Sequence, residues 1–221
     1  MRYAHFGEGK YEECEQVIQQ LLREIDPSVE LPPITQPMRE EHHAGSVCHR
    51  ATGQLYLGHQ SGRIGNGGGF KEDQIADYAF HRSLADSFFY ANGCRASTAE
   101  HFEPIEEGPH SLRLKYEASA VNLVMASPHV PHAEVVIRQD GQPLTQKLAT
   151  RDSRFPGSRE RRESYLVVNS PGMYFLVENH EFGVHELEPQ CSAGVAAFAF
   201  TFTSRVDQVA SALQAEDPAE P

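Results

Sequence analysis

The sequence predicts a mainly β protein: an antiparallel, jelly-roll-like β-sandwich with one amphipathic helix near its N-terminal end. Between Leu112 and Ala118, apolar side chains alternate with charged ones, which is the period of a strand with one wet face. Seven to ten short apolar segments follow one another, separated by turn residues, and the spacing leaves no room for crossover helices. These observations favour a sandwich over a parallel α/β sheet.

The predicted helix spans Tyr11–Ile25. Its glutamate-rich start suits the positive end of the helix dipole, and Asp26-Pro27 ends it. Its apolar stripe needs a partner, which is either the predicted sandwich or a second copy of the chain in a homodimer through this helix. A strictly monomeric chain with a flexible helix would contradict the homodimer. The stripe follows helical spacing and consists of Tyr11, Cys14, Ile18, Leu21, Leu22 and Ile25.

A proline-containing linker, residues 27–45, separates the helix from the predicted sandwich, residues 46–205. We expect the tail, residues 206–221, to be largely disordered. The strands of the sandwich are predicted at Gln54–His59, Phe88–Tyr90, Glu100–Ile105, Leu112–Ala118, Val121–Met125, Ala133–Arg138, Ser164–Val168, Met173–Val177, Val184–Leu187 and Val195–Thr203.

The pattern also predicts how the central strands are arranged and which face of the last strand carries its phenylalanines. The segments over residues 112–118, 121–125 and 133–138 are predicted to form one antiparallel sheet, and Asp140-Gly141 suits a tight turn. In the last strand, alternation places three phenylalanines on one face, namely Phe198, Phe200 and Phe202.

Composition excludes several functions. The net charge of −12 over 221 residues argues against nucleic acid and anionic membrane as partners. No apolar run is long enough to span a membrane and no signal peptide is evident, so we expect a cytoplasmic chain, or an extracytoplasmic one in a longer parent. The four cysteines, which include no CxxC pair, are expected to be buried, reduced thiols: Cys14, Cys48, Cys94 and Cys191.

Several landmarks carry a family resemblance. The opening RYAHFGEGKYEECEQVIQQLLRE (Arg2–Glu24) resembles the last strand and helix of a thioredoxin-like domain of the redoxin, AhpC/TSA-type class. The remainder resembles the C-terminal domain of DipZ-type thioredoxin fusion proteins. The matching segments are YLGHQSGR (Tyr56–Arg63), VIRQDGQPL (Val136–Leu144), MYFLVENHEFGVHELE (Met173–Glu188) and GVAAFAFTF (Gly194–Phe202).

The resemblance implies a β-sandwich similar to carbohydrate-binding modules, preceded in residues 1–26 by the remnant of a thioredoxin-like domain whose redox CxxC lies upstream. It therefore favours a non-catalytic accessory module without a cofactor, with a glycan, a protein or the thioredoxin-like domain as partner. One alternative is a carbohydrate-binding module, although the chain contains no Trp to stack on a sugar. Another is one part of a thiol–disulfide oxidoreductase or peroxide-reducing enzyme.

Candidate ligand-binding residues are Tyr56, Arg63, Arg151, Asp152 and Arg154. Guanidinium groups suit carboxylate or phosphate ligands, but charged loops at the end of a sandwich are commonly solvated surface, and this interpretation is preferred for the basic loop. The basic loop also contains Arg159, Arg161 and Arg162. A sugar-binding face would use aromatic side chains, most of which are expected in the core: Tyr56, Phe70, Tyr78, Phe88, Phe89 and Tyr90.

Two further patterns are weak. SGRIGNGGGF (Ser61–Phe70) is glycine-rich, but phosphate-binding loops need a strand–helix setting, so it is interpreted as a loop at the end of a sheet. One cluster contains zinc-ligand residue types, yet a structural zinc site normally needs a second pair, and no metal is expected. That cluster is His42, His43, Cys48 and His49. No GxSxG or comparable catalytic motif occurs.

Overall fold

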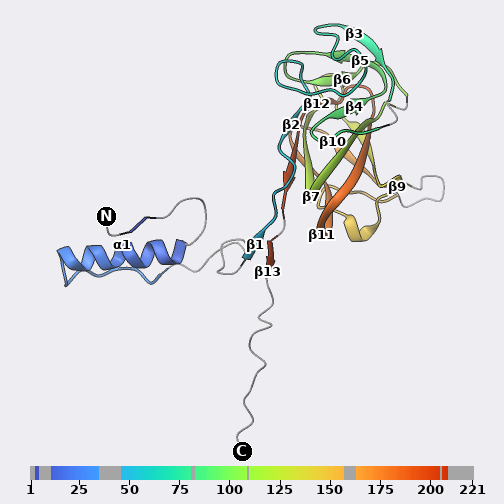
Figure 1. Cartoon of the computed structure of the whole chain (residues 1–221). Coiled ribbons are helices and arrows are strands. Elements are labelled where there is room, and N and C mark those ends of the chain that lie inside the picture. Colours follow the sequence, from blue (N-terminus) through green and yellow to red (C-terminus); the bar gives the residue numbers. More distant parts are fainter. Residues whose placement is uncertain are drawn as a thin grey trace, which may run out of the picture. The chain divides into compact units, whose positions relative to one another are not determined.

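The computed structural model describes residues 3–4, 11–34, 46–80, 83–108, 110–156, 163–204 and 206–208 (Figure 1). The chain divides into two compact units. One is Arg50–Ser204, and the other combines Met1–His49 with Arg205–Pro221.

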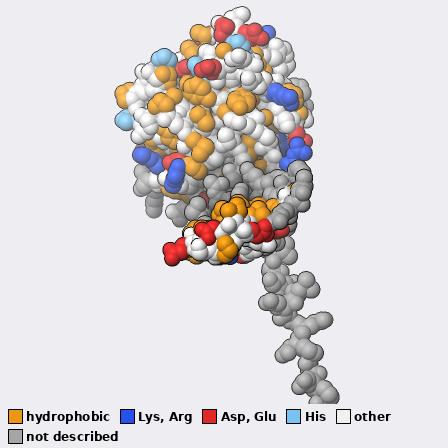
Figure 2. All heavy atoms as spheres, turned by 90° about the vertical axis from the view of Figure 1, so that its left-hand side faces the viewer, with side chains coloured by type: hydrophobic (Ala, Val, Ile, Leu, Met, Phe, Trp, Pro, Cys, Tyr) orange, Lys and Arg blue, Asp and Glu red, His pale blue; other side chains and the backbone are white. Residues whose placement is uncertain are grey.

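Helix α1 (Tyr11–Ile25) confirms the predicted helix. The polar residue Gln19 is buried, and its amide donates a 2.9 Å hydrogen bond to the Pro32 carbonyl of the segment that follows. Part of the apolar stripe stays uncovered: Ile18 is 57% and Ile25 83% exposed, and hydrophobic side chains are visible on the helix surface (Figure 2). Within the described residues of this unit, the stripe therefore lacks a full packing partner.

The same unit contains a two-stranded antiparallel sheet. Strand β1 (Ser46–Cys48) pairs with β13 (Val206–Gln208), with Val47 opposite Asp207. Three residues of the predicted disordered tail thus form a strand, because they find a pairing partner about 160 residues earlier, which local composition cannot indicate. Residues 209–221 lie outside the described residues.

The unit Arg50–Ser204 is an antiparallel β-sandwich, as predicted (Figure 1). Its elements are β2 (Leu55–Tyr56), β3 (Ile75–Tyr78), β4 (Phe89–Ala91), β5 (Gly93–Ser97), β6 (Phe102–Pro104), β7 (Leu112–Ala126), β8 (Ala133–Gln139), β9 (Gln142–Pro143), the 3₁₀ helix η2 (Gln146–Leu148), β10 (Tyr165–Val168), β11 (Gly172–Cys191) and β12 (Ala196–Thr203). The main strand order is β10-β8-β11-β7-β12-β6-β5-β3. Beside this path, β2 pairs with β12, β4 with β7 and β9 with β8.

Two long strands replace four predicted short ones. β7 runs unbroken through both predicted segments of the central block, and β11 joins the segments predicted at residues 173–177 and 184–187. Their pairing runs from Met125 opposite Gly172 to Leu114 opposite Leu187, with two irregularities in register. β7 and β8 belong to one antiparallel sheet, as predicted, and β11 lies between them and pairs with both. Polar residues interrupt the apolar pattern without ending the strand, because long-range pairing outweighs local propensity.

The alternation in the central block predicts the core correctly. Leu112, Leu114 and Tyr116 are buried, whereas Arg113 and Glu117 face outward. The outward Arg113 is held by Glu188, with 2.8 Å between Nη2 and Oε2, and its guanidinium lies 4.3 Å from the ring centre of Phe80. Removal of the inward apolar side chains from water provides the main driving force for packing the sandwich.

The predicted turn at Asp140-Gly141 is also confirmed. Asp140 has φ 51° and Gly141 φ 72°, both in the left-handed region that a tight turn between β8 and β9 requires. The Asp140 carboxylate additionally accepts a 2.8 Å hydrogen bond from the backbone N–H of Glu186. Among the described residues, no helix has the length and apolar character needed to cross a membrane.

A buried polar network connects the long strands. The Tyr116 hydroxyl donates to Gln139 Oε1 at 2.6 Å and accepts from Asn179 Nδ2 at 3.0 Å, and Gln139 Nε2 donates to Asn179 Oδ1 at 2.8 Å. Asn179 lies in the irregular part of β11, between Glu178 and Gly183. Burial raises the pKa of Tyr116, so its hydroxyl stays protonated and available as a donor.

Replacing Tyr116 with Phe is expected to lower the free energy of unfolding by about 1–3 kcal/mol, because buried polar atoms of Gln139 and Asn179 lose their partner. The matched control is Tyr56→Phe, which removes an exposed hydroxyl and is expected to change stability by less than about 0.5 kcal/mol. Urea denaturation of the two variants measures both values. Equal stability of the variants would contradict the role of the network.

Candidate functional site

Three neighbouring hollows on the sandwich share lining residues, and together they are called the trough. The first (about 320 Å³) is lined by Arg50, Ala51, Thr52, Gly53, Asp86, Ser87, Lys115, Tyr116, Glu117 and Val184. The middle hollow (about 340 Å³) is lined by Gly53, Gln54, Leu55, Tyr56, Ser61, Arg63 and Ser87. The third (about 380 Å³) is lined by Gln54, Tyr56, Gly58, Gln60, Ser61, Ala99, Glu100, Val124, Phe198 and Ala199. Shared lining residues join each hollow to the next.

Tyr56 lies where the middle and third hollows meet. Strand β2 pairs with β12, which places Tyr56 opposite Ala199. Its neighbours Leu55 and Leu57 are buried, so strand alternation turns Tyr56 outward, where it is 46% exposed. Its hydroxyl donates to Gln54 Oε1 at 3.2 Å. The small side chain of Ala199 leaves the tyrosine ring accessible from the trough.

Phe198 also lines the trough, which alternation did not predict. The register of β12 against β7 shifts between Ala197 and Ala199, so one residue is inserted as a bulge. Phe200 is buried in the core and Phe202 packs against it, whereas Phe198 lines the third hollow with Ala199. The prediction that all three phenylalanines share one face is therefore wrong for Phe198.

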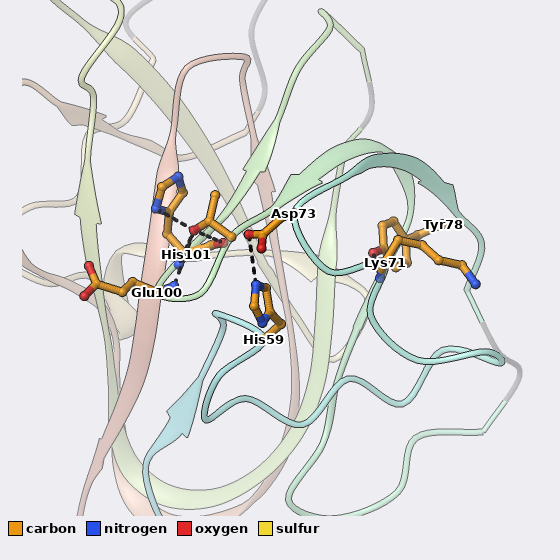
Figure 3. Close-up of polar contacts among 7 residues, drawn as sticks. His59, Lys71, Asp73, Tyr78, Glu100 and His101 are labelled. Atoms are coloured by element: carbon orange, nitrogen blue, oxygen red, sulfur yellow. Dashed lines mark hydrogen bonds and ion pairs between the residues drawn. The ribbon is translucent and has the colours of Figure 1, made fainter.

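The wall of the third hollow is built by close docking of two loops. His59 N–H donates to the Thr98 carbonyl at 2.9 Å, and Gln60 N–H donates to the Ala99 carbonyl at 3.1 Å. Gly58 permits this approach, because a Cβ there would overlap the Ala99 carbonyl oxygen. Figure 3 shows His59 directed at Asp73, with 3.1 Å between Nε2 and Oδ1. These contacts hold Gln60 in the wall.

The turn that faces this loop is itself internally bonded. The Thr98 hydroxyl donates to the His101 carbonyl at 3.1 Å and accepts from the His101 N–H at 3.0 Å. The His101 ring lies 5.3 Å from the Phe198 ring, between centres, and Glu100 projects away from it (Figure 3). Glu100 therefore extends from a fixed turn at the edge of the third hollow.

Arg63 contributes the charge of the middle hollow. Its carbonyl accepts a 3.1 Å hydrogen bond from the N–H of Phe89, and Gly65 N–H donates to the Phe89 carbonyl at 2.7 Å. Phe89 is completely buried, so the backbone at Arg63 is fixed to the core. The Arg63 side chain is exposed and has no acidic partner among the described residues. It thus presents an uncompensated positive charge.

The glycine-rich segment after Arg63 is held by a buried asparagine. The Asn66 amide donates to the carbonyls of Ala79 and Ala91 at 2.7 and 2.8 Å, and its Oδ1 accepts from the Ala91 N–H at 2.8 Å. The next described element after this segment is strand β3 and not a helix, so the strand–helix setting of a phosphate-binding loop is missing. Asn66 thus ties the glycine-rich segment to Ala91 of β4.

The structure places Arg151, Asp152 and Arg154 outside the trough. The Arg151 guanidinium lies 3.9 Å from the ring centre of Phe175, and Asp152 Oδ2 accepts a 2.8 Å hydrogen bond from the Phe175 N–H. The backbone of Arg154 pairs with Tyr165 through hydrogen bonds of 2.7 and 3.0 Å. These contacts attach the loop to β10 and β11. The predicted partners Arg159, Arg161 and Arg162 lie outside the described residues.

Most predicted platform aromatics belong to the core, as expected. Phe89, Tyr90 and Tyr78 are buried, and Phe70 packs against Phe89 and Phe102 with ring centres 5.8 and 6.1 Å apart. Phe88 is half-buried. Tyr56 is the exposed member of the predicted set.

The weak zinc-type cluster lies largely outside the described residues. His42 and His43 lie outside them, the side chain of Cys48 is not described, and His49 is half-buried. No group of three or more His, Cys, Asp or Glu side chains arranged to hold a metal occurs in the described part of the chain.

Two thiols of the sandwich are held in their protonated form. Burial raises the pKa of Cys191 to about 11. The pKa of Cys94 is also raised, first by burial and then by the carboxylates of Glu106 and Asp77. Both cysteines are free of disulfides. Because the thiolate is the reactive form, neither has the environment of a redox nucleophile.

Most of the chain matches one known protein family. The family model described as "Thioredoxin like C-terminal domain" matches residues 52–203. The chain belongs to this family. The match covers the strands of the sandwich from β2 to β12 and the trough-lining residues other than Arg50 and Ala51, whereas α1 lies before it. No curated protein sequence matches the chain.

Solved structures show distant similarities. A family two carbohydrate esterase from Cellvibrio japonicus has 13% identity and a TM-score of 0.37, over 73% of this chain and 35% of that chain. A family 6 carbohydrate-binding module has 16% identity and a TM-score of 0.31, over 61% and 96%. A two-domain esterase active on acetylated mannans has 13% identity and a TM-score of 0.32, over 87% and 46%. The chain spans less than half of either esterase, and these likenesses carry no argument about activity.

Replacing Gly58 with Ala is expected to lower the melting temperature, because the added Cβ meets the rigid backbone at Ala99. The destabilisation should be about 1–3 kcal/mol. Gly67→Ala is the matched control, since a Cβ there meets nothing within 4 Å and its φ is not in the left-handed region. Calorimetry of both variants tests the docking of the two loops; equal melting temperatures would refute it.

Proposed function

We propose that the sandwich is a non-catalytic accessory domain of a DipZ-type, thioredoxin-like protein of the redoxin class, and that its trough is the recognition site. Membership of the thioredoxin-like C-terminal domain family over residues 52–203 carries this proposal. The likeness of residues 2–24 to the end of a thioredoxin-like domain supports it. In such a protein, the CxxC that performs redox chemistry lies outside this chain, and residues 1–26 complete the catalytic domain.

The state of the thiols agrees with an accessory role. Cys191 is fully buried, with a pKa of about 11, and the pKa of Cys94 is raised as well. Thiol–disulfide exchange needs a thiolate that is accessible and has a pKa near the ambient pH. The sandwich therefore supplies recognition or docking, while the upstream domain supplies the chemistry.

Insulin reduction by the chain with a thiol donor tests this proposal. We expect no turnover above the donor alone, because the thiols of the sandwich stay protonated and Cys191 is in addition fully buried. A CxxC-containing thioredoxin serves as the positive control. Measurable turnover by the isolated chain would overturn the accessory role and favour the alternative in which this chain itself takes part in thiol redox chemistry.

Carbohydrate binding is a second candidate function, favoured by the trough. Tyr56 and Phe198 line the same hollow, together with Gln54, Gln60 and Glu100. Sugars are recognised by this combination of an aromatic face for the C–H side of the ring and planar polar groups for its hydroxyls. The trough also extends over three neighbouring hollows, which suits a chain of sugar units better than one small molecule.

A glycan array tests this candidate. Tyr56→Ala is expected to weaken binding of any captured glycan about tenfold, because the aromatic face is lost, whereas Tyr56→Phe keeps the ring and most of the affinity. Tyr56 is exposed, so neither change should unfold the sandwich. Absence of binding across the array, or equal binding by the Ala variant, would contradict a glycan site here.

A further inference from the structure

We propose that the middle hollow selects an acidic sugar unit, a uronic acid within a linear oligosaccharide, and that Arg63 determines this specificity. The inference rests on the carbohydrate-binding candidate function and specifies its ligand class. Arg63 would bind the carboxylate of the sugar while Tyr56, in the same hollow, contacts the sugar ring.

The charge of the middle hollow carries the inference. Arg63 is the sole ionised side chain among the residues that line it; the others are apolar, glycine, amide or hydroxyl groups. Ser61, Ser87 and Gln54 add neutral hydrogen-bonding groups. A guanidinium binds a carboxylate with two parallel N–H donors, which gives both affinity and orientation. An anion in this hollow therefore meets one positive charge and no lining carboxylate.

The two outer hollows differ from the middle one in the charge of their lining side chains. In the first, Lys115 is paired with Asp86 at 3.1 Å, and Glu117 accompanies Arg50, so positive and negative charges are balanced. In the third, Glu100 is the charged lining residue, and it accepts hydrogen bonds from sugar hydroxyls. A second carboxylate would be repelled there. The arrangement thus fits an anionic unit in the middle with a hydroxyl-rich unit beside it.

The position of Arg63 is fixed before any ligand binds. Its backbone is attached to the buried Phe89 through the parallel bridge at Ile64 and the hydrogen bonds on either side. In a chain of net charge −12, a positive side chain held in a hollow without a described acidic partner attracts an anionic group. Because the backbone that carries the side chain is already fixed, less conformational entropy is lost when the guanidinium pairs with a ligand.

The experiment is titration calorimetry of the full chain with tri-galacturonate and with a hyaluronan tetrasaccharide, each compared with its methyl ester. Esterification removes the negative charge and keeps the sugar chain. We expect at least one free acid to bind about tenfold more tightly than its ester, and added salt to reduce that difference. Arg63→Ala should lower binding of the acid to the level of the ester and leave binding of the ester unchanged.

Two variants control for charge and fold. Arg63→Lys keeps the charge without the paired donors and should lie between wild type and Arg63→Ala. Arg154→Ala removes an exposed arginine outside the trough and should leave binding unchanged. Arg63 is exposed, so the variants should retain the wild-type melting temperature, which calorimetry verifies.

The outcomes separate the two levels of the proposal. Equal binding of acid and ester, or acid binding that survives Arg63→Ala, overturns the selection of acidic sugars and leaves carbohydrate binding standing. Absence of binding by both forms of both probes overturns the acidic-sugar inference, and silence on the glycan array is the separate result that removes carbohydrate binding itself. The accessory role is judged independently by insulin reduction.

Discussion

The pairing of β7 with β11 is the constraint on which the rest of the sandwich depends. It extends from Met125 and Gly172 to Leu114 and Leu187, and it buries the alternating apolar side chains of the central block. β12 lies on the other edge of β7, and β2 pairs with β12. The position of Tyr56 therefore depends on a series of strand pairings that begins at β7. A change that weakened the central pair would displace the trough without touching it.

Irregular backbone is stabilised by buried amide side chains. Where β11 departs from regular register, Asn179 joins Tyr116 and Gln139 in a bonded network. Where the chain runs from Arg63 into the glycine-rich segment, Asn66 supplies three hydrogen bonds to backbone atoms of other segments. Buried polar groups are costly unless they are paired, so these networks specify one loop conformation. The trough thus has rigid walls although it is made largely of loops.

The proposed binding residues lie at loops and strand ends, whereas burial holds the Cys191 thiol protonated in the core. The middle hollow combines the exposed ring of Tyr56 with the charge of Arg63. A scaffold that binds through loops leaves its strands to packing. This division agrees with the proposed accessory role for a domain of the thioredoxin-like C-terminal family.

The sequence by itself determined the local features: the bounds of α1, the tight turn at Asp140, and the inward side chains of the central block. It also singled out Tyr56 and Arg63, the first by its aromatic character and the second by its charge. Tertiary structure decided what pairs with what. It placed β11 between β7 and β8, moved Phe198 to the trough through a bulge, and used Asp152 to fasten a loop. Alternation reports which face a side chain occupies, whereas strand partners and register depend on contacts distant in sequence. The sequence does not show that Arg50, Tyr56 and Phe198 line one trough. The bulge in β12 and the two docked loops place them there, and both depend on contacts between distant segments.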